Sequence, residues 1–140
     1  MTKQSSIKIL RFIPLVTLAI ISLFVAAGLS LQRRPFYFDF DLSSYALRSS
    51  LHKVEHFQAT ALIFLLAWLA FGNRRISVAF FLTILVGLGW EIAEATAVGH
   101  TARLSDLAPD LVAAVSCLLV AMFVRRSRLN TLTAFNSMRR

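Results

Sequence analysis

Four long stretches of apolar residues alternate with short polar connections along the chain. The first runs from about 12 to 31 and contains no charged residue. About twenty helical residues at about 1.5 Å each span about 30 Å, the thickness of a bilayer's hydrocarbon core. Three further stretches follow, at about 54–71, 76–98 and 107–124. The pattern therefore predicts an all-α membrane protein with four transmembrane helices in a single domain, 1–140.

The first stretch has a second interpretation, a cleaved signal peptide. Lys3, Lys8 and Arg11 would form its basic region, and the small residues at 25–27 its cleavage site. The apolar stretch is long for a signal peptide, so we expect a retained helix.

The basic residues predict the orientation of the helices. With the N-terminus inside, the cytoplasmic regions hold ten Lys and Arg residues and no acid, whereas the outer connections hold five. Because Lys and Arg collect in cytoplasmic loops, we expect both termini in the cytoplasm. Residues 125–140 would form a basic cytoplasmic tail near anionic lipid head groups. All seven acidic residues then lie in or beside the outer connections: Asp39, Asp41, Glu55, Glu91, Glu94, Asp106 and Asp110.

Composition supports a membrane protein, and the placement of the basic residues argues against a nucleic-acid partner. The chain is 57% hydrophobic, against roughly 45–50% in ordinary soluble domains. Its net charge of +8 is typical of nucleic-acid binding. Here the basic residues flank apolar segments, so membrane lipids are the expected partner and no nucleic acid is expected. Cys117, the only cysteine, lies in an apolar run and allows no internal disulfide.

The first outer connection alternates aromatic and polar residues. Phe36, Phe38 and Phe40 occupy every second position, so an extended chain would place their rings on one side. We expect an interfacial segment with its rings among the lipid head groups. A lid over a polar site is the alternative.

Polar residues at three helix ends form the candidate binding site. Helices of a bundle pack about 8–10 Å apart, so side chains from neighbouring ends can touch. Counted back from Val98, Glu91 lies about 10 Å inside its helix. Glu91 and Asp110 interrupt apolar segments and must face the bundle interior or a wet cavity. The candidate ligand-binding residues are Lys53, His56, Glu91, Glu94, His100, Arg103, Asp106 and Asp110.

Each of these residues also has a purely structural interpretation. Asp106 could cap the last helix, and Glu94 could lie exposed at the interface. Lys53 and Arg103 could extend to lipid head groups. A network of ion pairs would also satisfy the buried charges without any ligand, formed by Lys53, His56 and Arg103 with Glu91 and Asp110.

One five-residue string raises the question of a metal. His52-Lys53-Val54-Glu55-His56 fits the H-x-x-E-H pattern of one metalloprotease class, with the histidines as zinc ligands and the glutamate as base. The string is short and lacks its usual context. We therefore expect no metal and no other cofactor.

Three groups of residues resemble the VanZ-like family of small bacterial integral membrane proteins. Lys53-Val54-Glu55-His56-Phe57 is similar to the family's Lys-x-x-His-Phe, and Glu91-Ile92-Ala93-Glu94 to its Glu-x-x-Gln. Gly99-His100, followed by Asp106 and Asp110, is similar to its Gly-Arg segment with an Asp and then an Asn or Asp. The chain departs from the family pattern at His52, Glu94 and His100, and it lacks the Gly after the last acid.

The resemblance implies a multi-pass helical protein of the bacterial cytoplasmic (inner) membrane, in a family linked to resistance to glycopeptide antibiotics such as teicoplanin. We expect a binding role at the cell envelope, for an anionic or amphiphilic molecule such as a lipid-linked envelope intermediate or a lipoglycopeptide. An accessory subunit of a larger membrane protein complex is the first alternative. The second is an intramembrane hydrolase or transferase with His56 as base and Glu91 or Asp106 orienting it.

Overall fold

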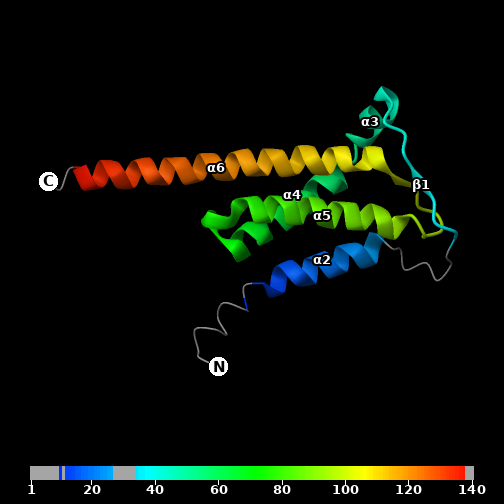
Figure 1. Cartoon of the computed structure of the whole chain (residues 1–140), viewed down its shortest axis with the longest axis horizontal. Coiled ribbons are helices and arrows are strands. Elements are labelled where there is room, and N and C mark those ends of the chain that lie inside the picture. The colour runs from blue at the N-terminus through cyan, green and yellow to red at the C-terminus, as the bar shows by residue number, and fades with distance from the viewer. Residues whose placement is uncertain (1–9, 11, 27–33, 138–140) are drawn as a thin grey trace.

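Four α-helices make up most of the molecule (Figure 1). The computed structural model describes residues 10, 12–26 and 34–137. The helices are α2 (Ile13–Ala26), α4 (Val54–Phe71), α5 (Ile76–Glu94) and α6 (Leu107–Ser137). The shorter elements are β1 (Phe38–Asp39), α3 (Ser44–Ser50), η1 (Asn73–Arg75), β2 (Ala102–Arg103) and η2 (Leu104–Asp106), the two η elements being 3-10 helices.

Three helical segments are long and apolar enough to cross a membrane, as the sequence predicts. They are Val54–Phe71, Asn73–Glu94 and Leu104–Ser127. The first expected span begins as α2, whose 14 residues would extend about 21 Å. The remainder of that span, 27–31, lies outside the described residues.

Small side chains hold the helices together. α2, α4 and α5 share a core that includes Ala67, Ala70 and Ala79, all fully buried. α6 packs on α4 and α5 and buries Ala114 and Ala121. Membrane helices typically meet through such small residues because they let the backbones approach. Many large apolar side chains along these helices point outward and are exposed, as a lipid-facing surface requires.

Two helix ends differ from the sequence prediction. α5 ends at Glu94 rather than 98, because the carbonyl oxygens of Ala95 and Thr96 accept hydrogen bonds from the backbone N–H groups of Tyr37 and Arg34. Glu91 therefore lies only about 4.5 Å from the end of its helix, not about 10 Å. α6 continues as a helix to Ser137, through most of the expected basic tail.

The first connection folds into more structure than its sequence pattern indicates. β1 pairs in parallel with β2, placing Phe38 opposite Ala102. The alternation of rings is confirmed: the ring centroids of Phe36 and Phe38 are 6.5 Å apart, and those of Phe38 and Phe40 are 5.1 Å apart. The short helix α3 follows, with the Ser43 side chain accepting a hydrogen bond from the Ala46 N–H at its start.

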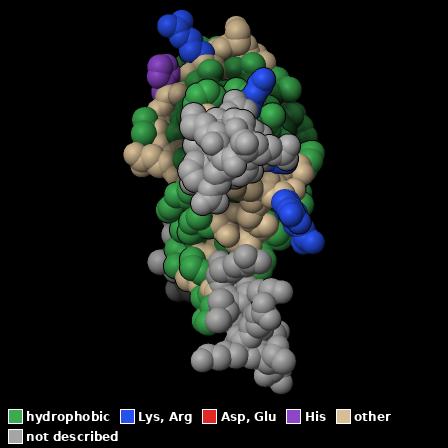
Figure 2. Space-filling model, turned by 90° about the vertical axis from the view of Figure 1, so that its left-hand side faces the viewer, with side chains coloured by type: hydrophobic (Ala, Val, Ile, Leu, Met, Phe, Trp, Pro, Cys, Tyr) green, Lys and Arg blue, Asp and Glu red, His purple; other side chains and the backbone are tan. Residues whose placement is uncertain are grey.

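The two ends of the bundle carry opposite charge patterns. One end, at the right of Figure 1, holds α3, the β1–β2 pair and every Asp and Glu of the chain; we call it the acidic end. The other holds the α4–α5 turn and the later part of α6, with Arg74, Arg75, Arg125 and Arg126; we call it the basic end. Figure 2 views the basic end, where Lys and Arg side chains are in view and no Asp or Glu is.

Candidate functional site

The buried carboxylate of Asp106 joins three segments at the acidic end. Its Oδ2 accepts a hydrogen bond from Lys53 Nζ at 2.7 Å, and its Oδ1 accepts one from Ser50 Oγ at 2.6 Å. The hydroxyl groups of Ser50 and Ser105 lie 3.1 Å apart. Lys53 immediately precedes α4, and Ser50 ends α3. The ammonium group of Lys53 is thus already paired, and Asp106 ties α3 and α4 to the start of α6.

Asp110, one turn into α6, brings α4, α5 and α6 together. Thr60 Oγ1 donates a 2.6 Å hydrogen bond to Asp110 Oδ1, and His56 Nδ1 lies 3.3 Å from the same oxygen. On the other side, a Cβ placed on Gly87 of α5 would lie 2.7 Å from Asp110 Oδ2. A side chain at this α5 position would displace the carboxylate, so Gly87 provides the space that Asp110 occupies.

Glu91 faces the interior beside Asp106 and His56. Its side chain is almost fully buried, at 1% exposure. Glu91 Oε2 accepts a 3.0 Å hydrogen bond from the backbone N–H of Arg103, which attaches the end of α5 to β2. Glu91 also lies within electrostatic range of Asp106 and His56.

The indole of Trp90 links two of the candidate residues. Its ring stacks on the imidazole of His56, with centroids 5.2 Å apart, and its Nε1 donates a 2.9 Å hydrogen bond to Glu94 Oε1. His100 Nδ1 lies 3.6 Å from the same Glu94 oxygen. Glu94 is therefore mostly buried and partnered, rather than exposed at the interface.

The guanidinium of Arg103 faces the first connection. Arg103 Nε lies 3.7 Å from Asp39 Oδ2, which is too far for a hydrogen bond. The backbone of Arg103 meanwhile holds Glu91. Each of the eight candidates thus has a contact with another: Lys53 with Asp106, His56 with Asp110, Glu91 with Arg103, and Glu94 with His100.

Six buried side-chain polar atoms have no hydrogen-bond partner among the described residues. Four are nitrogens, Arg34 Nε, Arg34 Nη2, His56 Nδ1 and Arg103 Nε; two are oxygens, Glu91 Oε1 and Asp110 Oδ2. Buried polar atoms in proteins are almost always satisfied, so a cluster of exceptions needs an explanation. All six belong to the acidic end.

An apolar groove of about 300 Å³ reaches Asp110 from the side of the bundle. Its apolar lining comes from the first connection, α3, α5, η2 and the start of α6: Leu42, Leu47, Ile84, Leu104, Leu107, Ala108 and Leu111. Asp110 is the one polar residue in this lining. The groove therefore combines a wall suited to a hydrocarbon chain with a buried carboxylate.

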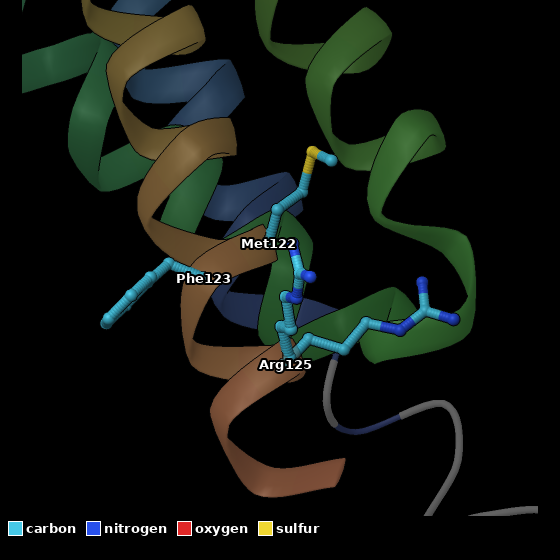
Figure 3. Close-up of a pocket in the computed structure, with 4 residues that line it drawn as sticks. Met122, Phe123 and Arg125 are labelled. Carbon is cyan, nitrogen blue, oxygen red and sulfur yellow. The ribbon is translucent and has the colours of Figure 1, made fainter. Parts of the chain in front are cut away.

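A larger hollow, of about 400 Å³, lies at the basic end along α6 (Figure 3). Met122 and Arg125 lie on the side of α6 towards the α4–α5 hairpin, and Phe123 points away. Arg126 completes the lining. This hollow lacks the unpartnered buried groups of the acidic end, within the part of the chain that is described. It is an open, basic surface rather than a built site.

The metalloprotease interpretation does not fit the geometry. His52 lies in the turn before α4, exposed, as is Glu55, whereas His56 points into the bundle. The two histidines therefore do not share a helical face. In the ranges that the structure describes, no three His, Cys, Asp or Glu residues come together as ligands for a metal ion.

Several residues of the site could not be found from the sequence. Ser50 and Ser105 are ordinary polar residues until the fold brings α3 against η2. From the sequence alone, Trp90 is one more apolar residue of its helix, yet it contacts both His56 and Glu94. Gly87 offered a signal, since a glycine within an apolar helix often marks a close approach by another group.

Comparisons of the chain with family models, with curated proteins and with solved structures found no match.

Proposed function

We propose that this protein is a multi-pass membrane protein that binds an amphiphilic molecule of the bacterial cell envelope at its acidic end. The observation that carries the proposal is the pair of buried, unpartnered carboxylate oxygens, Glu91 Oε1 and Asp110 Oδ2. An unsatisfied buried polar group costs about 1–3 kcal/mol, and more when it is charged. A ligand that donates hydrogen bonds to these oxygens would recover that cost.

The groove beside Asp110 supports an amphiphile over a fully polar ligand. Its apolar wall would take a hydrocarbon chain, and Asp110 would contact the polar part of the same molecule. Ligand sites commonly combine an apolar lining with a few placed polar groups. Lys53 contributes less to ligand binding than its charge indicates, because its ammonium group already donates a hydrogen bond to Asp106.

Native mass spectrometry of the protein released from mild detergent tests the proposal. We expect the wild type to retain a co-purified lipid, and Glu91→Gln and Asp110→Asn to lose most of it. Both substitutions keep the side-chain shape and remove the charge. Glu55→Gln is the matched control, since Glu55 carries the same charge at the same end but is exposed. Equal retention by all four proteins would contradict the proposal.

We also propose four spans with both termini in the cytoplasm of a bacterial cell. The charge segregation supports this topology, because the basic end has no acid and Lys and Arg concentrate on the cytoplasmic side. In a Cys117→Ser background, a membrane-impermeant maleimide added to intact cells should label a cysteine at Tyr45 and not one at Asn73. The opposite labelling would invert the topology.

We propose further that the protein is VanZ-like. Several of the residues that carry the resemblance contact one another: Lys53 contacts Asp106, His56 contacts Asp110, and Glu94 contacts His100. The family's link to glycopeptide resistance gives a direct test. Expression in a teicoplanin-susceptible strain should raise the inhibitory concentration for the wild type and not for Asp110→Asn; no change for either would remove the antibiotic role.

A second candidate function, an intramembrane hydrolase or transferase, is favoured by one contact. Asp110, rather than Glu91 or Asp106, lies within 3.3 Å of His56 Nδ1 and could orient that imidazole as a base. Turnover of a lipid-linked sugar phosphate by the wild type and not by His56→Ala would support catalysis. Stoichiometric retention of the same lipid without turnover would support binding alone.

A further inference from the structure

Five of the six unpartnered buried atoms at the acidic end are of two opposite kinds; the sixth, His56 Nδ1, can either donate or accept. Glu91 Oε1 and Asp110 Oδ2 can only accept hydrogen bonds while ionised. Arg103 Nε and the two Arg34 nitrogens can only donate. A ligand that satisfies one kind alone would leave the other without a partner.

Arg103 and Glu91, one residue of each kind, are in contact. The backbone N–H of Arg103 donates to Glu91 Oε2 at 3.0 Å, so an unpartnered guanidinium nitrogen and an unpartnered carboxylate oxygen belong to contacting residues. Arg103 Nε stops 3.7 Å from Asp39 Oδ2, and the ammonium of Lys53 is hydrogen-bonded to Asp106.

A singly charged head group fits this arrangement poorly. An anion beside the guanidinium of Arg103 would also face the carboxylate of Asp39, which repels it. A cation beside Glu91 would leave the guanidinium unsatisfied. A head group that carries both charges a short distance apart would place each against its complement, through charge-assisted hydrogen bonds.

We propose that the ligand is a zwitterionic phospholipid whose head group holds a primary ammonium close to its phosphate, as in phosphatidylethanolamine. The ammonium would donate to Glu91 Oε1 and Asp110 Oδ2, the phosphate would accept from Arg103, and an acyl chain would lie in the groove lined by Leu107 and Leu111. This inference rests on the proposed amphiphile binding and specifies its ligand class.

The experiment offers the purified wild type three phospholipids with identical acyl chains, and measures retention by native mass spectrometry. Phosphatidylethanolamine has N–H donors and a phosphate, phosphatidylcholine has a quaternary ammonium without N–H donors, and phosphatidylglycerol has no ammonium. Because a charge-assisted hydrogen bond is lost with either competitor, we expect retention of phosphatidylethanolamine to be at least about tenfold tighter, a difference of about 1.4 kcal/mol.

Matched variants separate the two halves of the head group. Glu91→Gln should reduce the preference for phosphatidylethanolamine over phosphatidylglycerol, because it removes the ammonium's partner. Arg103→Gln should weaken both lipids by a similar factor, because both carry the phosphate. Glu55→Gln and Arg126→Gln, which change exposed charges at the two ends, should leave the preference unchanged.

The outcomes distinguish this inference from the proposed function beneath it. Equal retention of all three lipids, or a preference for phosphatidylglycerol, overturns the zwitterion and leaves amphiphile binding in place. Retention of none of these lipids, and of no co-purified amphiphile, overturns both. The wild-type comparison among lipids needs no variant, so it decides the question even if a substitution prevents folding.

Discussion

The two ends of the bundle treat charge in opposite ways. At the basic end, Arg74, Arg75, Arg125 and Arg126 are exposed, and none forms an ion pair in the part of the chain that is described. At the acidic end, the carboxylates of Asp106, Glu91 and Asp110 are at most 3% exposed. The basic end has its charged side chains on the surface, whereas the acidic end has three of its charged side chains buried inside the protein.

Exposed and buried charges make different demands on their surroundings. Exposed arginines beside apolar side chains are stable in water and near lipid phosphates, and they require no precise partner. Buried carboxylates lose their hydration and remain stable only with hydrogen bonds and opposite charges around them. Substitutions at the two ends should therefore have very different effects on stability.

The largest effect is expected for Asp106→Ala. The substitution removes the partner of Lys53 and of the buried Ser50 hydroxyl, so the free energy of unfolding should fall by about 3 kcal/mol. Reversible unfolding in mixed micelles measures this change. Glu55→Ala, which removes an exposed acid of the same end, should cost less than about 1 kcal/mol. Equal costs for the two would erase the distinction between buried and exposed acids.

A smaller loss, about 2 kcal/mol, is expected for Gly87→Ala. The new methyl group would meet Asp110 Oδ2 at 2.7 Å, and the carboxylate would have to leave its position between Thr60 and the α5 backbone. The double variant with Asp110→Ala provides the control. If the clash is the cause, adding Gly87→Ala to Asp110→Ala should cost almost nothing; additive costs would point to a different origin.

The substitution Ser50→Ala is expected to lower the free energy of unfolding by about 1 kcal/mol. This change removes one hydrogen bond to Asp106 and leaves the bond from Lys53 in place. The same unfolding assay applies. Ser49→Ala is a suitable reference, because Ser49 neighbours Ser50 in α3 but is exposed. A cost for Ser49→Ala as large as that for Ser50→Ala would show that helix propensity, and not the link to Asp106, decides the result.

The smallest effect is expected at the basic end, for Arg125→Ala. Its side chain is exposed and pairs with no acid among the described residues, so stability should change by no more than about 0.5 kcal/mol. The same substitution should weaken association with anionic vesicles if this end lies near lipid head groups. A loss of stability comparable to that of Asp106→Ala would mean that the basic end is also a built structure.

Local sequence patterns predicted the bounds of the helices better than they predicted the contacts between segments. The bounds of α4 and the start of α5 follow from apolar stretches and the polar Gly72–Arg75 turn, and they match the prediction. The end of α5 does not, because hydrogen bonds from Arg34 and Tyr37 take its carbonyl groups. No local pattern contains that information.

The same limit applies to the site. The cost of burying charge indicates that Glu91 and Asp110 face the interior, and the structure buries both. The pairing of His56 with Asp110, in place of Glu91 or Asp106, depends on the rotation of α6 about its axis and on the space at Gly87. These are properties of packed helices, so sequence spacing left the choice open.

The most direct test of the binding site is to observe the head group beside its predicted partners. In lipid nanodiscs that contain phosphatidylethanolamine, nuclear Overhauser effects should connect the head-group methylene protons with the ring protons of His56 and Trp90, which lie beside Asp110 and Glu94. Contacts from these rings to acyl-chain protons alone, or to no lipid proton, would show that no head group enters the acidic end and would contradict the account.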